Sequence, residues 1–273
     1  MRADHASEVA RGQRFEFGKN WARFLSELDE KRITLAVDSL RDMTGLDDFH
    51  GRSFLDIGCG SGLFSLAARR LGATVFSFDF DPESVACAHE LKRRYCPQDG
   101  LWSIESGSAL DTGYLKGLGQ HDIVYSWGVL HHTGAMWQAL ENAAVPCRPG
   151  GLLYISIYND QGEISRIWTA IKRLYNVLPR PGKVVMAVSV SVFFRLKHAL
   201  ARAARLENPF AMRQPARGMS WFRDVVDWVG GYPFEVASPE QIFDFFRTRG
   251  FTLIRLTTVR GHGCNEFIFR RNR

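Results

Sequence analysis

The sequence lacks several features that would assign it to other classes of protein. It has five cysteines among 273 residues, an odd number, scattered along the chain and without a CxxC pair. This pattern argues against a disulfide framework and against a zinc site. The longest apolar stretch, VVMAVSVSVFF at 184–194, is shorter than the roughly 20 residues that a membrane-spanning helix needs. The N-terminus has no continuous apolar segment of the secretory kind, so we expect a cytoplasmic protein.

The sequence has no large excess of charge of one sign, so its charge excludes few classes of protein. A hydrophobic content of 45% with a charged content of 23% is that of an ordinary globular protein, which predicts a folded core. A net charge of +6 and an isoelectric point near 9.2 leave an acidic partner open, although soluble enzymes often carry such charge without one. At this length we expect one α/β core with an insert.

Predicted strands alternate with predicted helices between about residues 50 and 160. The strands are short runs rich in β-branched or aromatic residues: SFLDIG (53–58), TVFSFD (74–79), WSIESG (102–107), DIVYSWG (122–128) and LLYISIY (152–158). The clearest helix begins at Asp81-Pro82 and ends in the basic residues 92–94. This alternation predicts a parallel sheet with helices on both faces, and in such sheets ligands bind at the carboxyl ends of the strands.

A glycine-rich segment follows the first of these strands in FLDIGCGSGLF, residues 54–64. Gly58, Gly60 and Gly62 remove side chains where the backbone turns tightly and a ligand can come close. The segment does not match the dinucleotide fingerprint GxGxxG, because Leu63 stands at the last glycine position. A tight strand-to-helix turn without a ligand remains the alternative at this point.

The pattern Asp-x-Gly-x-Gly-x-Gly resembles motif I of the class I S-adenosylmethionine-dependent methyltransferases. The resemblance implies a Rossmann-like, seven-stranded, mostly parallel sheet with an antiparallel last strand, helices on both faces and a helical lid insert. It also implies that Asp56 lies near the methionine ammonium of the cofactor and that Asp79 holds the ribose hydroxyls, while Asp81 caps the following helix. The cofactor-binding candidates are Asp56, Gly58, Cys59, Gly60, Gly62, Asp79, Phe80, Ser108, Ala109, Trp127, Gly128 and Val129.

The third strand departs from the family pattern. Many members have Gly-Asp-Ala there, with the aspartate on the adenine amino group, whereas this chain has Ser108 between Gly107 and Ala109. A serine hydroxyl can still accept a hydrogen bond, and Asp111 is the alternative acceptor.

The candidate catalytic residues are His131 and His132, in WGVLHHTGAMW (127–137). Imidazole titrates near neutral pH, which suits a general base for a hydroxyl or amine acceptor. The alternative is that the pair packs or caps the next helix. The ubiquinone-type O-methyltransferases have Glu-x-x-Glu-His here and are associated with a divalent metal. Gly128 and His131 replace those glutamates, so we expect no metal.

Candidate substrate residues lie farther along the chain. Tyr158, Asn159 and Asp160 follow the fifth strand, where ordinary turn chemistry is the alternative. Trp228 and Tyr232 belong to the aromatic segment DWVGGYPFEVA, 227–237, which suits an acceptor pocket or the seam of a lid. Asn265 and its neighbour Glu266 are polar within an apolar strand, facing either the active site or solvent on an edge.

The expected parts of the chain are an N-terminal helical cap (1–50), a cofactor-binding core (51–160), a helical substrate-recognition insert (161–236), and a C-terminal helix with a β-hairpin (237–273). In the cap, Trp21 and Phe24 either close the site against water or pack in the core. The insert contains a basic amphipathic helix with an apolar stripe through Val185, Val188, Val192, Leu196, Ala199 and Ala203 and a basic stripe through Arg195, His198, Arg202 and Arg205. We expect its apolar stripe to pack on the domain, with peripheral membrane contact through 184–206 as the alternative.

The resemblance implies a methyltransferase that uses S-adenosyl-L-methionine, releases S-adenosyl-L-homocysteine, and methylates a hydroxyl or amine of a small metabolite by direct displacement. In style it is similar to the quinone and secondary-metabolite O-methyltransferases of small-molecule biosynthesis. An RNA methyltransferase and a catalytically silent partner protein are the alternatives. We expect no nucleic-acid partner, because the sequence contains no separate RNA-binding module. The oligomeric state stays open.

Overall fold

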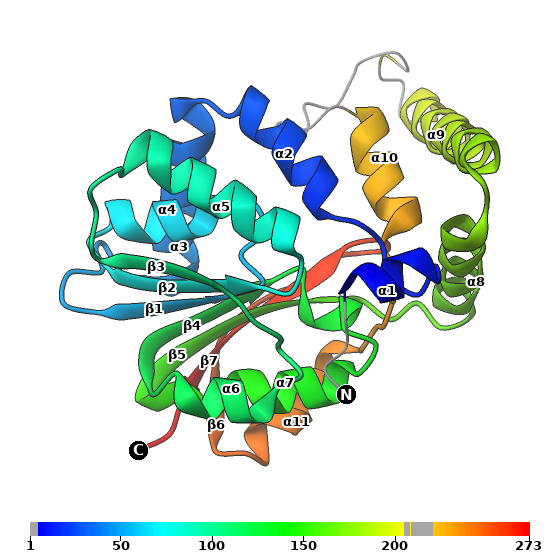
Figure 1. The fold of residues 1–273 in the computed structure, drawn as a ribbon. Coiled ribbons are helices and arrows are strands. Elements are labelled where there is room, and N and C mark those ends of the chain that lie inside the picture. The colour runs from blue at the N-terminus through cyan, green and yellow to red at the C-terminus, as the bar shows by residue number, and fades with distance from the viewer. Residues whose placement is uncertain (1–4, 205–207, 209–220) are drawn as a thin grey trace. The chain divides into compact units, whose positions relative to one another are not determined.

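The computed structural model describes residues 5–204, 208 and 221–273 (Figure 1). The chain divides into two compact units. The sheet unit comprises Glu16–Ser165 and Phe234–Arg273, and the helical unit comprises Met1–Phe15 and Arg166–Pro233. Within the described residues, no helix combines the length and the apolar character that crossing a membrane requires.

The sheet unit is built on a seven-stranded sheet with the order β3-β2-β1-β4-β5-β7-β6. The strands are β1 (Ser53–Ile57), β2 (Thr74–Asp79), β3 (Trp102–Ser106), β4 (His121–Trp127), β5 (Cys147–Tyr158), β6 (Phe251–Thr257) and β7 (Cys264–Arg271). Strands β1 to β5 pair in parallel, whereas β7 runs antiparallel to both β5 and β6. The predicted Rossmann-like sheet with a reversed last strand is therefore confirmed.

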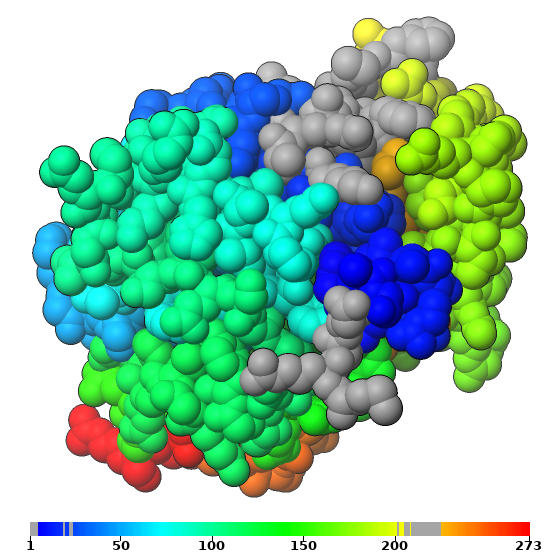
Figure 2. All heavy atoms as spheres, in the orientation of Figure 1, coloured from blue at the N-terminus to red at the C-terminus, as the bar shows by residue number. Residues whose placement is uncertain are grey.

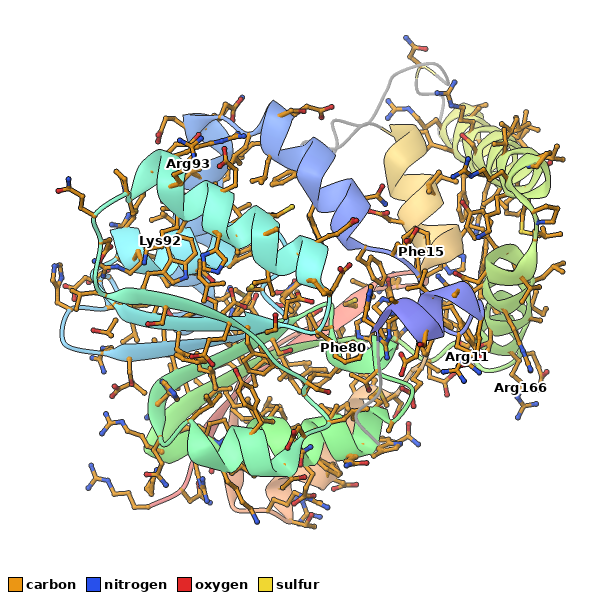
Figure 3. All side chains as sticks on the ribbon, viewed as in Figure 1. Arg11, Phe15, Phe80, Lys92, Arg93 and Arg166 are labelled. Carbon is orange, nitrogen blue, oxygen red and sulfur yellow. The ribbon has the colours of Figure 1, made fainter. Side chains whose placement is uncertain are left out.

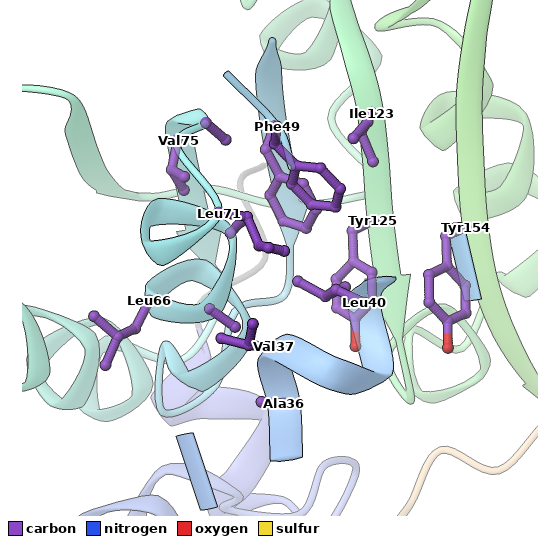
Figure 4. Packing of buried hydrophobic residues seen from close by; sticks show 14 of the residues in the cluster. Ala36, Val37, Leu40, Phe49, Leu66, Leu71, Val75, Ile123, Tyr125 and Tyr154 are labelled. Carbon is purple, nitrogen blue, oxygen red and sulfur yellow. The ribbon is translucent and has the colours of Figure 1, made fainter. Parts of the chain in front are cut away.

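Helices cover both faces of this sheet (Figure 1). The helices of the unit are α2 (Gly18–Glu27), α3 (Glu30–Thr44), α4 (Leu63–Arg70), α5 (Pro82–Tyr95), α6 (Thr112–Gly117), α7 (Met136–Ala144) and α11 (Pro239–Arg247), with a short 3-10 turn η1 (Leu130–His132). Neighbouring strand residues point to opposite faces, so Phe54 packs with α3 and α4 while Leu55 packs with α7 and α11. Figure 4 shows the first of these cores, around Phe49 and Leu40.

Local sequence signals account for the ends of these helices. The Asp81 side chain accepts a hydrogen bond from the Glu83 amide and caps α5, with proline at the next position. Lys92 and Arg93 lie on the last turn of α5, where cations interact favourably with the helix dipole (Figure 3). Ser238 opens α11 with the predicted capping box. Asp81 therefore has the capping role expected for it.

The helical unit consists of α1 (His5–Ala10), most of α8 (Glu163–Val177), α9 (Arg180–Ala203) and α10 (Trp221–Gly230). Its core is aromatic: Trp168 stacks on Phe194 with ring centroids 5.7 Å apart and meets Trp228 edge-on at 5.5 Å. Lys172 is buried, and its ammonium lies 4.2 Å from the centre of the Trp228 ring and donates to the Trp228 carbonyl. This unit thus has an apolar core of its own.

Helix α9 packs through a different face from the one expected. Ala187 and Ser191 are buried and Phe194 stacks on Trp168, so the small side chains let neighbouring helices approach. The predicted core stripe is exposed at five of its positions: Val185, Val188, Val192, Leu196 and Ala203. The expectation that this stripe packs on the domain is wrong. Arg205 of the basic stripe lies outside the described residues.

Candidate active site

The glycine segment between β1 and α4 forms a tight loop at the carboxyl end of the sheet. Gly58, Gly60 and Gly62 have φ angles of 76°, 53° and 80°, a region that side chains other than glycine rarely adopt. The amides of Gly58 and Cys59 both donate to the Phe78 carbonyl, at 2.8 and 3.0 Å. These hydrogen bonds fasten the loop to the end of β2.

Two of these glycines also allow other parts of the site to come close. A Cβ added at Gly58 would lie 2.4 Å from Cγ1 of Val129, and one at Gly60 would lie 3.0 Å from the Trp21 indole. Trp21 belongs to α2, so the N-terminal helix packs directly on the glycine loop. Its neighbour Phe24 is buried, with its ring edge-on to that of Trp21 and the centroids 5.9 Å apart.

Asp79, at the end of β2, accepts hydrogen bonds with both carboxylate oxygens. Oδ2 accepts from the Gly60 amide and Oδ1 from the Asp81 amide, each at 2.9 Å. Desolvation raises the pKa of Asp79 to about 6. Each oxygen keeps a second lone pair, so the carboxylate can still accept from two hydroxyl groups. Phe80 follows it at the same end of the sheet (Figure 3).

Asp56 ends a buried chain of hydrogen bonds that runs from the third strand to the first. The Trp102 indole donates to Ser77 Oγ at 2.9 Å, the Ser77 and Ser65 hydroxyls lie 2.7 Å apart, and Ser65 donates to Asp56 at 2.5 Å. Because an indole N–H can only donate, the chain has one direction and its last acceptor is the carboxylate. Burial raises the pKa of Asp56 to about 7.

We expect the free energy of unfolding of the ligand-free protein to fall between pH 4 and pH 7 because of Asp56. Its folded pKa of about 7 exceeds the ordinary 3.8, so folded Asp56 keeps a proton that the unfolded chain has lost. The stabilisation is complete below the unfolded pKa of 3.8 and is lost as the pH rises through the folded pKa of about 7. The change in the free energy of unfolding is on the order of 4 kcal/mol.

Urea unfolding at pH 5 and pH 8, compared between the wild type and Asp56→Asn, measures this change. The variant cannot ionise, so its stability should fall less between the two pH values. The difference between the two proteins isolates Asp56 from the other carboxylates, some of which have lowered pKa values and opposite slopes. Equal pH dependence in both proteins would refute the assignment.

At the third strand, Ser108 is half-buried and Ala109 is buried. The Ser108 hydroxyl accepts from the Leu110 amide at 3.2 Å, and the Asp111 carboxylate accepts from the Tyr114 amide at 2.9 Å. Asp111 is thereby the N-cap of α6. Each of the two adenine candidates therefore already accepts one backbone amide.

An aromatic and imidazole cluster lies where β4 and β5 end. His131 is fully buried and its ring centroid is 4.1 Å from that of Tyr158 and 4.5 Å from that of His132. His132 is 7% exposed, and its ring lies 5.0 Å from Phe17. Phe234 closes the other side of Tyr158, with ring centroids 5.0 Å apart. The two histidines thus lie in one apolar environment at the carboxyl end of the sheet.

Glu235 also supports this cluster, through contacts that span about a hundred residues of the chain. Its amide donates to the His131 carbonyl at 3.0 Å, and its carboxylate accepts from the Met136 amide at 3.0 Å, at the start of α7. Burial raises the pKa of Glu235. In the sequence Glu235 follows Tyr232 and Phe234 and precedes the last helix. That position does not indicate a contact with His131.

Val129, two residues beyond the end of β4, lies against the glycine loop at Gly58. The Trp127 indole donates to Glu266 at 3.0 Å, and the Tyr154 hydroxyl donates to the same carboxylate at 2.8 Å. Gly128, between Trp127 and Val129 in the sequence, has a φ of 75°, and a Cβ there would meet no atom within 4 Å. Glu266 therefore fixes the orientation of the Trp127 ring from β7.

The remaining substrate candidates fall in different places. Asn265 is buried on β7, which lies between β5 and β6, so the alternative of a solvent-exposed edge is wrong. The side-chain Nδ2 of Asn265 donates to Asn159 Oδ1 at 3.0 Å, and its side-chain Oδ1 accepts from the backbone amide of Val259 at 3.1 Å. Asp160 accepts from the Gly162 amide in a turn. Trp228 and Tyr232 belong to the helical unit.

The sheet order and the glycine loop define a domain of the class I S-adenosylmethionine-dependent methyltransferases, and comparison with known proteins agrees. Residues 55–155 match the family model described as a methyltransferase domain. The chain is 30% identical over 119 residues to the ubiquinone biosynthesis O-methyltransferase of Caulobacter sp. (strain K31), covering 44% of this chain and 46% of that protein. The chain is also 30% identical over 115 residues to the ubiquinone biosynthesis O-methyltransferase of Escherichia coli (strain K12 / DH10B), covering 41% of this chain and 45% of that protein.

Solved structures show the same fold. The magnesium protoporphyrin IX methyltransferase of Synechocystis PCC 6803 with bound SAH superposes with a TM-score of 0.55 at 16% identity, over 93% of this chain and 94% of that one. An O-methyltransferase family protein from Burkholderia thailandensis gives 0.54 at 16% identity, over 88% and 57%. The chain spans about half the length of the curated relatives that it matches. It carries a methyltransferase domain at residues 55–155, within the fold of the class I S-adenosylmethionine-dependent methyltransferases.

Proposed function

We propose that the protein transfers a methyl group from S-adenosyl-L-methionine to a hydroxyl or amine of a small metabolite. The observation that carries the proposal is the juxtaposition, at the carboxyl ends of adjacent strands, of a glycine loop tied to Asp79 and a buried pair of histidines. The glycine loop with Asp79 suits a cofactor that contains a ribose. The histidine pair suits a methyl acceptor that must lose a proton.

The residues present fit the cofactor. Gly58, Gly60 and Gly62 leave three positions of the loop without a side chain of their own, and Asp79 has lone pairs for the ribose hydroxyls. Ser108 and Ala109 would flank the adenine, with Trp127 and Val129 at the methionine end. When bound, S-adenosyl-L-methionine supplies an electrophilic methyl group on a positively charged sulfur.

On the acceptor side, His132 is the better candidate for the base. It is the less buried of the two histidines, so a bound acceptor can reach its ring more readily than that of His131. His132 would take the proton from the acceptor hydroxyl as the new bond to the methyl carbon forms. Tyr158, Phe17 and Phe234 would exclude water and hold an apolar acceptor, and most of the rate would come from positioning.

The thiol of Cys59 lies in the glycine loop but is a poor reactant there. All five cysteines are free, and burial raises the pKa of Cys59, which lies in the glycine loop. A thiol with a raised pKa has little thiolate and is a weak nucleophile. We therefore propose that Cys59 has no chemical part in the transfer.

The test is transfer of label from methyl-labelled S-adenosyl-L-methionine into a host extract divided into polar metabolites, lipids, RNA and protein. We expect label in one of the two small-molecule fractions with the wild type and none with Asp79→Ala. Label in RNA would overturn the substrate class. No label in any fraction, together with no cofactor binding in calorimetry, would favour the catalytically silent protein instead.

A further inference from the structure

Helix α9 presents a row of large apolar side chains to solvent. Val184, Val185, Val188, Val192, Phe193, Leu196 and Leu200 are all exposed, with Leu200 at 71% and Val185 at 66%. Figure 2 shows this helix, in yellow-green, at the surface. Exposed apolar residues are common singly, but a contiguous row along one helix marks an interaction site.

These side chains share one side of the helix, away from the face that packs. At about 100° per residue, Val188, Val192 and Leu196 fall within about 80° of one another. By the same geometry the buried residues Ala187 and Ser191 lie about 140° and about 100° from Val192, the middle of these three. Helix α9 therefore has two apolar faces. One packs within its own unit, and the other is exposed in the described part of the chain.

Cationic side chains border the exposed apolar row on both sides. By the same geometry, Arg195 and Arg202 fall along one edge of the row and Lys197 along the other. The segment 180–203 contains no aspartate or glutamate. Long cationic side chains can lay their stems along apolar surface and extend their charges toward an anionic one.

We propose that this face of α9 docks on the surface of a membrane that contains anionic phospholipids. Apolar side chains of this size enter the boundary between headgroups and acyl chains, and flanking cations pair with the lipid phosphates. The charge pattern disfavours a second copy of the chain as the occupant, because two such faces would bring their cations together. The surface is independent of the proposed methyl transfer.

The test is flotation of the full chain with vesicles of phosphatidylglycerol and phosphatidylcholine in equal parts. We expect binding to these vesicles and several-fold weaker binding to phosphatidylcholine alone. A variant with Val188→Ser, Val192→Ser and Leu196→Ser should bind at least tenfold more weakly, since each substitution removes an apolar side chain from the lipid. These positions are exposed, so thermal unfolding should change little.

The matched control places serine at three exposed apolar residues of the sheet unit, Leu35, Leu101 and Ile254. It loses the same kind of surface without touching α9, and it should float like the wild type. Equal flotation of the wild type and the α9 variant would overturn the proposal. So would a wild type that does not float but forms a dimer that the α9 variant abolishes.

Discussion

Replacing Asp79 with alanine is expected to weaken the binding of S-adenosyl-L-methionine by about a hundredfold or more. The carboxylate would accept from both ribose hydroxyls, and a hydrogen bond to a charged group contributes about 1.5–3 kcal/mol. The same oxygens hold the amides of Gly60 and Asp81, so the variant also loosens the glycine loop. Both losses act in the same direction on cofactor affinity.

Calorimetric titration with S-adenosyl-L-homocysteine, the product, measures the effect without turnover. Asp79→Asn should give an intermediate affinity, because its one amide oxygen can replace only part of the acceptors. The matched control is Asp29→Ala, which removes a carboxylate that caps a helix, α3, outside the loop and outside the cofactor candidates. Its affinity should stay close to that of the wild type. An unchanged affinity in Asp79→Ala would sink the ribose assignment.

The sheet and its caps could be predicted because their signals are local. A strand such as TVFSFD shows itself by its β-branched and aromatic residues, and Asp81-Pro82 marks a helix start from neighbouring residues alone. The two strands near the C-terminus, β6 and β7, follow from the same local patterns. The glycines of the loop gain their meaning from resemblance to a family motif rather than from spacing alone.

Contacts between distant segments could not be predicted in this way. Phe17 contacts His132 from 115 residues earlier in the chain, and Phe234 contacts Tyr158 from 76 residues later. No periodicity in the sequence indicates either contact. Helix α9 shows a different limit. Its apolar stripe was visible, yet two faces were compatible with packing, and the small residues Ala187 and Ser191 gave the face that packs.

His132→Gln is expected to lower the turnover number by about a hundredfold to ten-thousandfold while leaving cofactor affinity nearly unchanged. That is the usual contribution of a general base to a proton transfer. Glutamine keeps most of the volume beside Phe17 and Tyr158 but cannot take up a proton at neutral pH. The effect should therefore appear in the chemical step rather than in folding or cofactor binding.

Single-turnover kinetics with the acceptor found by labelling measure this step, and His131→Gln serves as the matched control. His131 is fully buried, so its variant should lose stability more than rate. The pH dependence separates a base from a packing residue: the wild-type rate should rise with pH through one ionisation that is missing in His132→Gln. A variant that keeps this ionisation and most of its rate would show that His132 only packs against its neighbours, and the proton would then leave by another route.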